Sequence, residues 1–453
     1  MKRLTILVLL ALALPAWAAD PTWQAGFAKV SITPTEPLWM AGYASRKAPA
    51  DGTLSDLYAR AMVLRDADGH AAVLVALDLV GIDRAFSKTM SDSIRAKHQL
   101  PREAITFAVS HTHSGPVVGS TLHAMYFLTP EHEKKVAVYT ALLAKKVDQV
   151  VDEAFKALAP ATVAWGQGTA GFAVNRRENK EPEVPALREK GALKGPTDHD
   201  VPVLAVRDAT GKLLGVAFGY ACHATVLSDQ KWCADYPGFA ATGLEAKHPG
   251  AIALFVAGCG ADQNPLPRKS VELAKNYGQQ LAAAVEKVLD APMSPLKPQW
   301  TGTYREIELP LHEIPTREAL VADSLQADKF VAARAKLLLE QLKTEGSIPK
   351  SYPYPVQTWR LGNELAMTAL GGEVVVDYSI RLKKELEPGK TWVVAYANDV
   401  MAYIPSLRVL KEGGYEGASA MIYYGLPSIW GVAVEDLIVA EVIRQAKAVR
   451  KSR

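Results

Sequence analysis

Hydrophobic residues of this chain fall into short apolar runs that alternate with longer segments of helical periodicity. The apolar runs predict strands at Ala59–Leu64, Ala72–Val80, Ile105–Ser110, Val203–Val206, Val216–Tyr220, Ile252–Ala257 and Trp392–Ala397. Apolar residues that recur every three or four positions predict helices at Arg84–His98, Pro130–Leu158, Ser270–Leu289, Arg317–Thr344 and Val434–Val449. This alternation predicts an α/β fold in which layered mixed β-sheets carry flanking helices.

Two segments depart from this alternation. Residues Phe172–Pro202 are charged, contain Gly and Pro and show no period, so we expect a long surface loop of the kind that often serves function. The helical stretch at 317–344 lies between Pro315 and Pro349, which favours an inserted hairpin or arm. No linker divides the chain convincingly, so we expect one domain over residues 19–453 that includes this helical insertion.

The N-terminus has the pattern of a secretory signal. Lys2 and Arg3 precede the apolar run Leu4–Leu14, and the small-residue motif Ala16–Ala18 follows it. We therefore expect residues 1–18 to be a signal peptide and the mature protein to be secreted or periplasmic. A spanning helix needs about 20 apolar residues, and no later segment has that length, so no integral membrane segment is expected after cleavage.

Charge and cysteine content exclude several classes of protein. The formal net charge is +3, and removal of Lys2 and Arg3 with the signal leaves about +1 without blocks of one sign, which argues against a nucleic-acid partner. The chain has only 3 cysteines, so it is not a disulfide scaffold. Cys222 and Cys233 are the nearest pair, and whether they form a disulfide stays open at this point.

The candidate chemistry lies where two predicted strands end. Ile105–Ser110 leads directly into His111 and His113, and Val216–Tyr220 is soon followed by His223. Neutral imidazoles are common zinc ligands, and a strand fixes their direction. Histidines at the ends of two strands predict a metal site along one edge of a sheet.

At these residues the chain resembles the neutral or alkaline ceramidases in their N-terminal catalytic domain. The order and approximate spacing of the shared motifs agree from about residue 30 to 425. The motifs are Ser110-His111-Thr112-His113-Ser114-Gly115-Pro116, Met40-Ala41-Gly42-Tyr43, Leu57-Tyr58-Ala59-Arg60-Ala61, Asn175-Arg176, Gly372-Glu373, Asn398 with Tyr403, and Tyr415-Glu416-Gly417-Ala418-Ser419.

The resemblance implies the fold of that catalytic domain, a Zn²⁺ cofactor and a set of site residues. His111, His223, Glu373 and Tyr403 match the zinc ligands of the family, and His113 and Arg176 match groups that bind or polarise the substrate. The family hydrolyses the amide of ceramide, an N-acyl sphingoid lipid. The implied function is therefore hydrolysis of a lipid-like amide by metal-activated water, with His113, Arg176 and the Tyr403 hydroxyl stabilising the oxyanion and His113 protonating the leaving amine.

Two departures from the family pattern bear on the mechanism. Ceramidases carry a motif serine in the run that here reads Ala261-Asp262-Gln263-Asn264-Pro265, so Asn264 replaces that serine. An asparagine is not a nucleophile, but its amide can donate to an oxyanion or hold a water, which favours direct attack by metal-activated water over an acyl-serine route. We also expect no counterpart of the C-terminal β-sandwich that ceramidases append, and we therefore expect membrane-embedded ceramide to be a poorer substrate.

Several alternatives remain open from the sequence. Loss of the serine motivates a second hypothesis, a catalytically silent protein that binds a lipid or envelope ligand, and the same metal site would also serve an esterase or lactonase. Tyr396 or Tyr415 could be confused with Tyr403 as the ligand. Asp262 is equally well explained as a carboxylate that orients a histidine ligand and as a buried turn residue.

Overall fold

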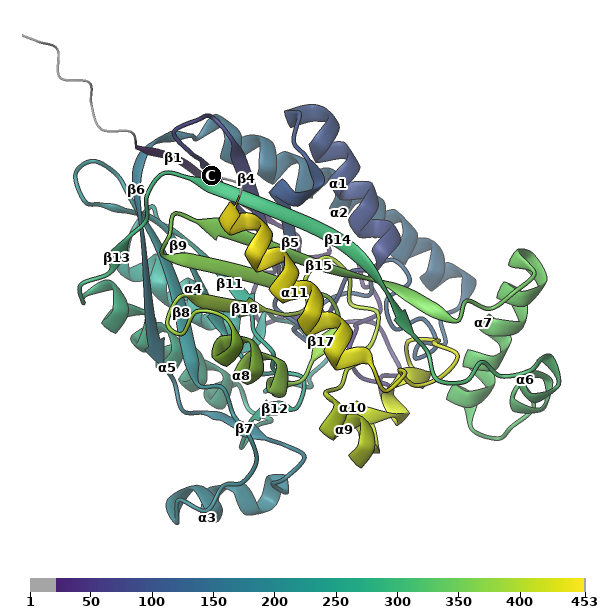
Figure 1. Ribbon diagram of the computed structural model, residues 1–453. Coiled ribbons are helices and arrows are strands. Elements are labelled where there is room, and N and C mark those ends of the chain that lie inside the picture. The colour runs from purple at the N-terminus through teal and green to yellow at the C-terminus, as the bar shows by residue number, and fades with distance from the viewer. Residues whose placement is uncertain (1–21, 452–453) are drawn as a thin grey trace, which may run out of the picture.

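Two β-sheets face each other across a hydrophobic core, and helices cover the outer face of each sheet (Figure 1). The computed structural model describes residues 22–451. The large, nine-stranded sheet has the order β11-β9-β8-β6-β1-β3-β4-β5, with β13 paired to β6. Its strands are β1 (Trp23–Ser31), β3 (Tyr58–Arg65), β4 (Ala71–Leu77), β5 (Ile105–Val109), β6 (Ala159–Thr169), β8 (Asp200–Arg207), β9 (Leu213–Tyr220), β11 (Ile252–Ala257) and β13 (Ser294–Pro295).

The smaller sheet has four strands in the order β14-β15-β16-β18. They are β14 (Trp300–Pro310), β15 (Ser351–Leu361), β16 (Leu365–Leu370) and β18 (Thr391–Val394). Large apolar side chains of both sheets meet between them, among them Trp165 and Leu254 from the large sheet and Trp359, Met367 and Trp392 from the small one. This shared core fixes the two sheets as the inner layers of the fold.

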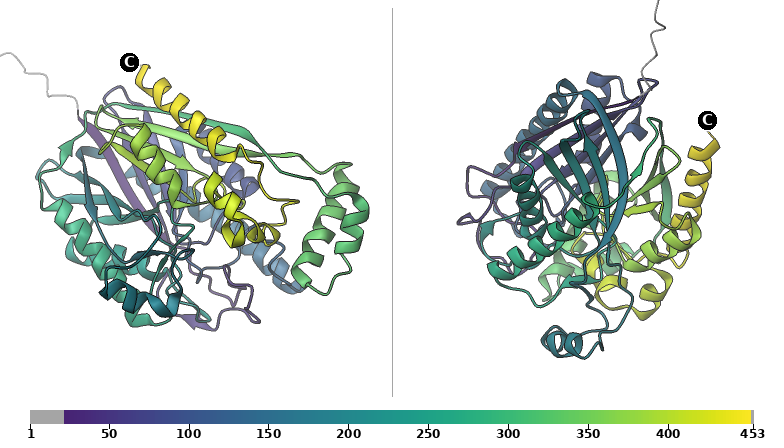
Figure 2. Two further views of the ribbon diagram at one scale, coloured as in Figure 1. Left: turned by 60° about the horizontal axis from the view of Figure 1, so that its bottom comes forward. Right: turned by 90° about the vertical axis from the view of Figure 1, so that its left-hand side faces the viewer.

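Helices form the outer layers (Figure 2). The large sheet is covered by α1 (Arg84–His98), α2 (Pro130–Lys156), α4 (Asp235–Lys247) and α5 (Val271–Leu289). The small sheet is covered by α11 (Val434–Lys451), with α8 (Val376–Glu385) beside it. The predicted α/β class with layered mixed sheets and flanking helices is confirmed.

Shorter elements complete the chain. Three two-stranded sheets pair β2 (Gly52–Thr53) with β10 (Lys231–Trp232), β7 (Ala173–Asn175) with β12 (Gln263–Pro265), and β17 (Glu373–Val374) with β19 (Tyr403–Ile404). The remaining α-helices are α3 (Val184–Glu189), α6 (Arg317–Asp323), α7 (Lys329–Glu345), α9 (Leu407–Glu412) and α10 (Gly414–Gly417). Helices α6 and α7 occupy the segment expected as a helical insertion and project from the body as an arm with its own small apolar cluster (Figure 1).

Two sequence predictions of local structure were wrong in part. The segment Phe172–Pro202, predicted as a loop, contains β7 and α3, and its Asn175 and Asn179 are buried. The strand predicted at Trp392–Ala397 stops at Val394, because Tyr396 and Asn398 take the left-handed backbone conformation, with φ of 53° and 63°. Strand β15 was missed because it contains Pro353 and Pro355, which lie outside the part of β15 that pairs with β16.

The membrane and disulfide predictions can be compared with the structure for residues 22–451. None of the helices there is both long and apolar enough to cross a bilayer. The predicted signal peptide, residues 1–18, lies outside the described residues. Cys222, Cys233 and Cys259 are all buried free thiols, so Cys222 and Cys233 are not bridged.

A short segment after β18 joins the two ends of the large sheet. The amide of Ala395 donates to the carbonyl of Ala257 at the end of β11 (2.9 Å), and the amide of Asn398 donates to Phe107 of β5 (2.9 Å). The Asn398 side chain adds two bonds, accepting from the Phe107 amide (3.2 Å) and donating to Gln357 Oε1 (2.8 Å). Residues 395–398, named the junction segment below, therefore hold β11 and β5 in one place.

We expect Asn398→Ala to lower the free energy of unfolding by about 2 to 4 kcal/mol, measured by denaturant titration. The substitution leaves the buried Phe107 N–H and Gln357 Oε1 without partners and places alanine in a left-handed conformation. Asn276→Ala, on the exposed face of α5, is the control and should change stability by less than about 0.5 kcal/mol. Equal effects for the two variants would show that the junction segment carries no special share of the stability.

Candidate active site

Two histidines from opposite ends of the large sheet meet at the junction segment. His111 follows β5 in a left-handed conformation (φ 58°), and its Nδ1 donates to the Val80 carbonyl at 2.5 Å. His223 follows β9, and its Nδ1 donates to the Gly260 carbonyl at 2.8 Å. Because each Nδ1 carries the ring proton, each Nε2 presents a lone pair toward the common centre.

The centre is occupied by the Glu373 carboxylate. Its Oε2 lies 3.2 Å from His111 Nε2 and 3.1 Å from His223 Nε2, and the residue is only 3% exposed. Gly372 makes this position possible, because its φ is +74° and a Cβ there would lie 2.6 Å from Ile404 Cγ1 and 2.7 Å from the Ala402 carbonyl. The Gly-Glu pair of the sequence motif therefore places this carboxylate through backbone geometry.

Tyr403 enters the site through strand pairing. Strands β17 and β19 are parallel, and Glu373 is the register partner of Tyr403. The Tyr403 hydroxyl lies 3.3 Å from His223 Nε2. The two tyrosines that could be confused with it are also near the site, but their contacts differ, since the Tyr396 ring packs 4.4 Å from the His111 ring and Tyr415, 42% exposed, packs against the Tyr403 ring.

His113 stands beside the two other imidazoles. Its Nε2 lies 3.1 Å from His111 Nε2, and its buried Nδ1 has no hydrogen-bond partner. Gly42, with φ +96°, lets the backbone pass directly behind this ring, because a Cβ at Gly42 would lie 2.5 Å from His113 Cγ. The ring nitrogens of His111, His113 and His223 lie within 4.8 Å of one another, close enough to share one metal ion.

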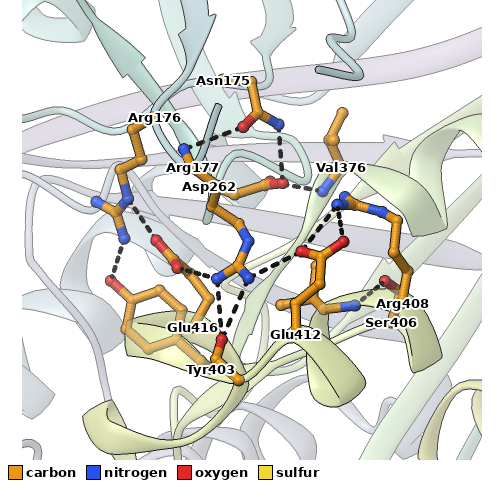
Figure 3. Close-up of polar contacts among 12 residues, drawn as sticks. Asn175, Arg176, Arg177, Asp262, Val376, Tyr403, Ser406, Arg408, Glu412 and Glu416 are labelled. Carbon is orange, nitrogen blue, oxygen red and sulfur yellow. Dashed lines mark hydrogen bonds and ion pairs between the residues drawn. The ribbon is translucent and has the colours of Figure 1, made fainter. Parts of the chain in front are cut away.

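Arg176 links Tyr403 to Asn264. Its Nη2 donates to the Tyr403 hydroxyl (3.1 Å) and its Nη1 to Asn264 Oδ1 (3.3 Å). Its Nε donates to Glu416 Oε1 (2.7 Å), and Arg177 donates to the other oxygen of Glu416 (2.6 Å) (Figure 3). The adjacent Arg177 points to Glu416 and Glu412, so Arg176 alone of this pair reaches Tyr403.

Asp262 fits the turn interpretation. One carboxylate oxygen accepts from the Val376 amide (2.9 Å) and the other from the Asn175 side chain (3.2 Å), which Figure 3 also shows. Burial raises the pKa of this carboxyl to about 6. Its hydrogen bonds therefore hold β7 and the start of α8 together, and they do not orient a histidine.

Burial and neighbouring side chains shift the pKa values of the residues at the site. Burial and the positive charge of Arg176 lower the pKa of His223 to about 4. Burial also lowers the pKa of His113 well below its usual value, with His111 as the next contribution. For Glu373 burial acts to raise the pKa, but the facing His111 and His223 outweigh it, so the pKa lies well below its usual value.

The donor set suits a divalent metal. The Nε2 atom of His223 and the Oε2 atom of Glu373 are both acceptors, yet they face each other at 3.1 Å, and Glu373 Oε2 is buried without a hydrogen-bond donor. Two lone pairs at this distance repel unless a cation or proton lies between them. Imidazole nitrogens, a carboxylate and a phenol are ligands that zinc accepts.

Sequence reasoning missed two side chains that support the site. The Tyr424 hydroxyl donates to Glu373 Oε1, and the Glu416 carboxylate holds both arginines. Glu416 stands in one of the family-like motifs, so its position carried a signal that was not given a role. Tyr424 lies among other aromatic residues and carried no separate signal in the sequence.

Comparisons of the sequence with known proteins agree on one group. A family model described as neutral/alkaline non-lysosomal ceramidase, N-terminal, matches residues 23–264. The neutral ceramidase of Pseudomonas aeruginosa is 24% identical over 91% of this chain and 71% of that protein. The neutral ceramidase of Drosophila melanogaster is 25% identical over 54% of this chain, a match that covers 35% of the relative.

Comparisons of structures give the same group. The crystal structure of neutral ceramidase from Pseudomonas aeruginosa superposes with a TM-score of 0.74 at 20% identity, covering 96% of this chain and 75% of that one. A ceramidase complexed with C2 gives a TM-score of 0.72 at 18% identity, covering 95% and 76% of the two chains. At these identities the likeness establishes that the fold is shared.

We expect Glu416→Gln to lower the free energy of unfolding by about 1 to 3 kcal/mol, because Arg176 and Arg177 both lose a charged acceptor in a mostly buried setting. The matched control is Glu385→Gln, which removes an exposed pair with Arg381 one helical turn away and should cost less than about 0.5 kcal/mol. Thermal or denaturant unfolding measures both. A loss for Glu416→Gln no larger than the control would mean that the arginine pair is held by its other contacts.

Proposed function

The chain belongs to the neutral/alkaline non-lysosomal ceramidase family, and we propose that it is a zinc-dependent hydrolase that cleaves the amide bond of a lipid-like substrate. The single observation that carries this proposal is the convergence of His111, His223 and Glu373, with the Tyr403 hydroxyl at its edge. We further propose that residues 1–18 direct export and that residues 19–453 act as one domain with its helical insertion at 317–344.

The residues proposed as metal ligands are His111, His223, Glu373 and Tyr403. The Nδ1–carbonyl bonds of both histidines preset their Nε2 atoms for a metal, which removes the cost of ordering them at binding. A zinc ion bound there would lower the pKa of a bound water toward about 7 and would polarise the substrate carbonyl. The buried carboxylate contributes the negative charge that such an ion needs.

The residues around the ligands supply the remaining tasks of amide hydrolysis. Arg176 and the Tyr403 hydroxyl form a connected pair of donors at the edge of the centre, placed to stabilise negative charge on the carbonyl oxygen. His113 stands beside the ligands with an unpartnered Nδ1, and we assign it the transfer of a proton from the attacking water to the leaving amine. These assignments need no covalent intermediate on the protein.

Asn264 occupies the place of the family serine. Its Oδ1 accepts from Arg176 Nη1, so its Nδ2 group remains a donor toward the substrate side. An amide cannot attack a carbonyl as a serine hydroxyl would. We therefore assign Asn264 the role of a hydrogen-bond donor in a reaction where water attacks directly.

A row of aromatic rings supports a lipid-like acyl group. The ring of Tyr403 lies 5.3 Å from Tyr415, which lies 6.2 Å from Tyr423. Tyr423 lies 5.1 Å from Phe330 of the arm, and Phe330 lies 5.6 Å from Phe127, which is 47% exposed. Contacting aromatic rings that lead outward from the site suit a hydrocarbon chain.

We expect the purified protein to contain close to one zinc ion per chain. Removal of the metal with a chelator should abolish release of fatty acid from N-acyl amides, and added zinc should restore it. His111→Ala should lose the metal and lower kcat/KM at least about 100-fold. Elemental analysis and a fatty-acid release assay measure the two quantities.

The matched control is His312→Ala, because His312 is an exposed histidine that follows β14, outside the site. This variant should keep both its zinc and its turnover. A panel of N-acyl amides, esters and lactones with one acyl chain tests the bond that is cleaved. Zinc-free protein, or turnover unaffected by His111→Ala, would contradict the proposal, and binding without any turnover would favour a catalytically silent lipid-binding protein.

A further inference from the structure

A charged cavity opens beside the site on the side of Asn264. Its volume is about 580 Å³, and its walls include Arg176, Asn264 and Tyr415, so it is continuous with the residues that surround the centre. We infer that this cavity binds the amine half of the substrate and that this half is a neutral, polyhydroxylated group such as an amino sugar or an aminopolyol. The inference rests on the proposed function, since it concerns the same amide.

The walls of the cavity are mainly charged. Most of the lining side chains are charged, and they form ion pairs across the cavity. These pairs are Arg176 with Glu416, Arg177 with Glu412 and Arg268 with Glu181. A hydrocarbon chain placed here would strip water from these charges without offering them hydrogen bonds, which is unfavourable.

The charges of the cavity walls balance one another. Each of these arginines faces a carboxylate, so the walls carry neither a net positive nor a net negative field from the pairs. An anionic or cationic ligand would have to compete with an existing partner on every side. A neutral group with many hydroxyls can instead donate to the carboxylates and accept from the guanidinium groups without breaking the pairs.

Asn264 and Tyr415 give the cavity groups that suit a sugar-like ligand. Asn264 lies at the inner end with its Oδ1 already bonded to Arg176, which leaves its Nδ2 to donate to a substrate hydroxyl. Tyr415 contributes a ring that is 42% exposed, and Arg176 lies 5.7 Å from its centroid. An exposed aromatic ring among polar groups can pack against the C–H face of a sugar ring while the polar groups bind its hydroxyls.

The row of aromatic rings that begins at Tyr403 indicates how the two halves of the substrate are oriented. The row runs from Tyr403 through Tyr415 toward the arm, whereas the charged cavity lies toward Arg268. The acyl half would follow the apolar row, and the amine half would enter the charged cavity. Hydrolysis then forms the new C–O bond from water as the C–N bond breaks, and the amine leaves with a proton that came from the water.

The test uses amides that share one medium-length acyl chain and differ only in the amine half. The amine halves are glucosamine, serine as the anionic case, and hexylamine as the apolar case. We expect kcat/KM for the N-acylglucosamine to exceed that for the N-acylhexylamine at least about tenfold, with the N-acylserine below the N-acylglucosamine. The full-length mature protein and a fatty-acid release assay are used throughout.

Variants test whether the cavity causes the preference for the N-acylglucosamine. Arg268→Ala should lower kcat/KM for the N-acylglucosamine about tenfold more than for the N-acylhexylamine, because the Arg268 guanidinium, which pairs with Glu181, lines the cavity that would hold the hydroxylated amine half. Arg84→Ala is the matched control, since it breaks a similar pair between Arg84 at the start of α1 and Glu306 of β14 and should leave both substrates unchanged. Arg268→Gln, which keeps a polar side chain, and the melting temperature of each variant separate a local loss from a folding defect.

The outcomes separate this inference from the proposed function. If the hexylamide is the best substrate, or if Arg268→Ala changes all substrates alike, the polyhydroxylated amine is wrong while zinc-dependent amide hydrolysis stands. If the serine amide is preferred and the preference depends on Arg268, the cavity binds an anion and the inference is overturned. If no amide is hydrolysed, the proposed function fails first and this inference fails with it.

Discussion

The site depends on one constraint, which is that the two ends of the large sheet are held together by the junction segment at residues 395–398. Strands β5 and β9 are not neighbours, because β8, β6, β1, β3 and β4 lie between them in the sheet order. Curvature of the sheet brings these ends close, and the backbone bonds of Ala395 and Asn398 tie them to a third element. Without these backbone bonds, His111 and His223 would not be held close to each other.

This constraint explains which parts of the fold could be predicted from the sequence. The apolar runs identified β3, β5, β9 and β11, and the helical periods identified α1 with both of its ends correct. Each strand that delivers a histidine was therefore visible locally. The structure brings both histidines to one centre, but the sequence could not show that their strands lie far apart in the sheet order, because strand order is set by pairing between segments far apart in the chain, and no local pattern records it.

The same limit applies to the residues that support the centre. His111, His223, Glu373 and Tyr403 could be named because they match family motifs, and the structure brings these side chains together. The partners that orient them could not be named. The Val80 and Gly260 carbonyls that fix the imidazoles are backbone atoms, and any residue type can supply a carbonyl. Likewise, β15 was not predicted because it contains Pro353 and Pro355. A strand accepts a proline only where the proline nitrogen faces an unpaired side, and the sequence does not show which side that is.

The left-handed backbone at the site has a consequence for the evolvability of the enzyme. His111, Tyr396 and Asn398 all have positive φ, a conformation that non-glycine residues adopt at a cost on the order of 1 kcal/mol each. They cluster where the histidines, the carboxylate and the junction segment meet, so conformational energy is stored in the place where ligand geometry is set. At Asn398 this cost is offset by the hydrogen bonds of its side chain and backbone, whereas relaxing His111 or Tyr396 would recover conformational energy and move the imidazole and the ring packed on it. The proposed site therefore limits how far this part of the chain can be optimised for stability.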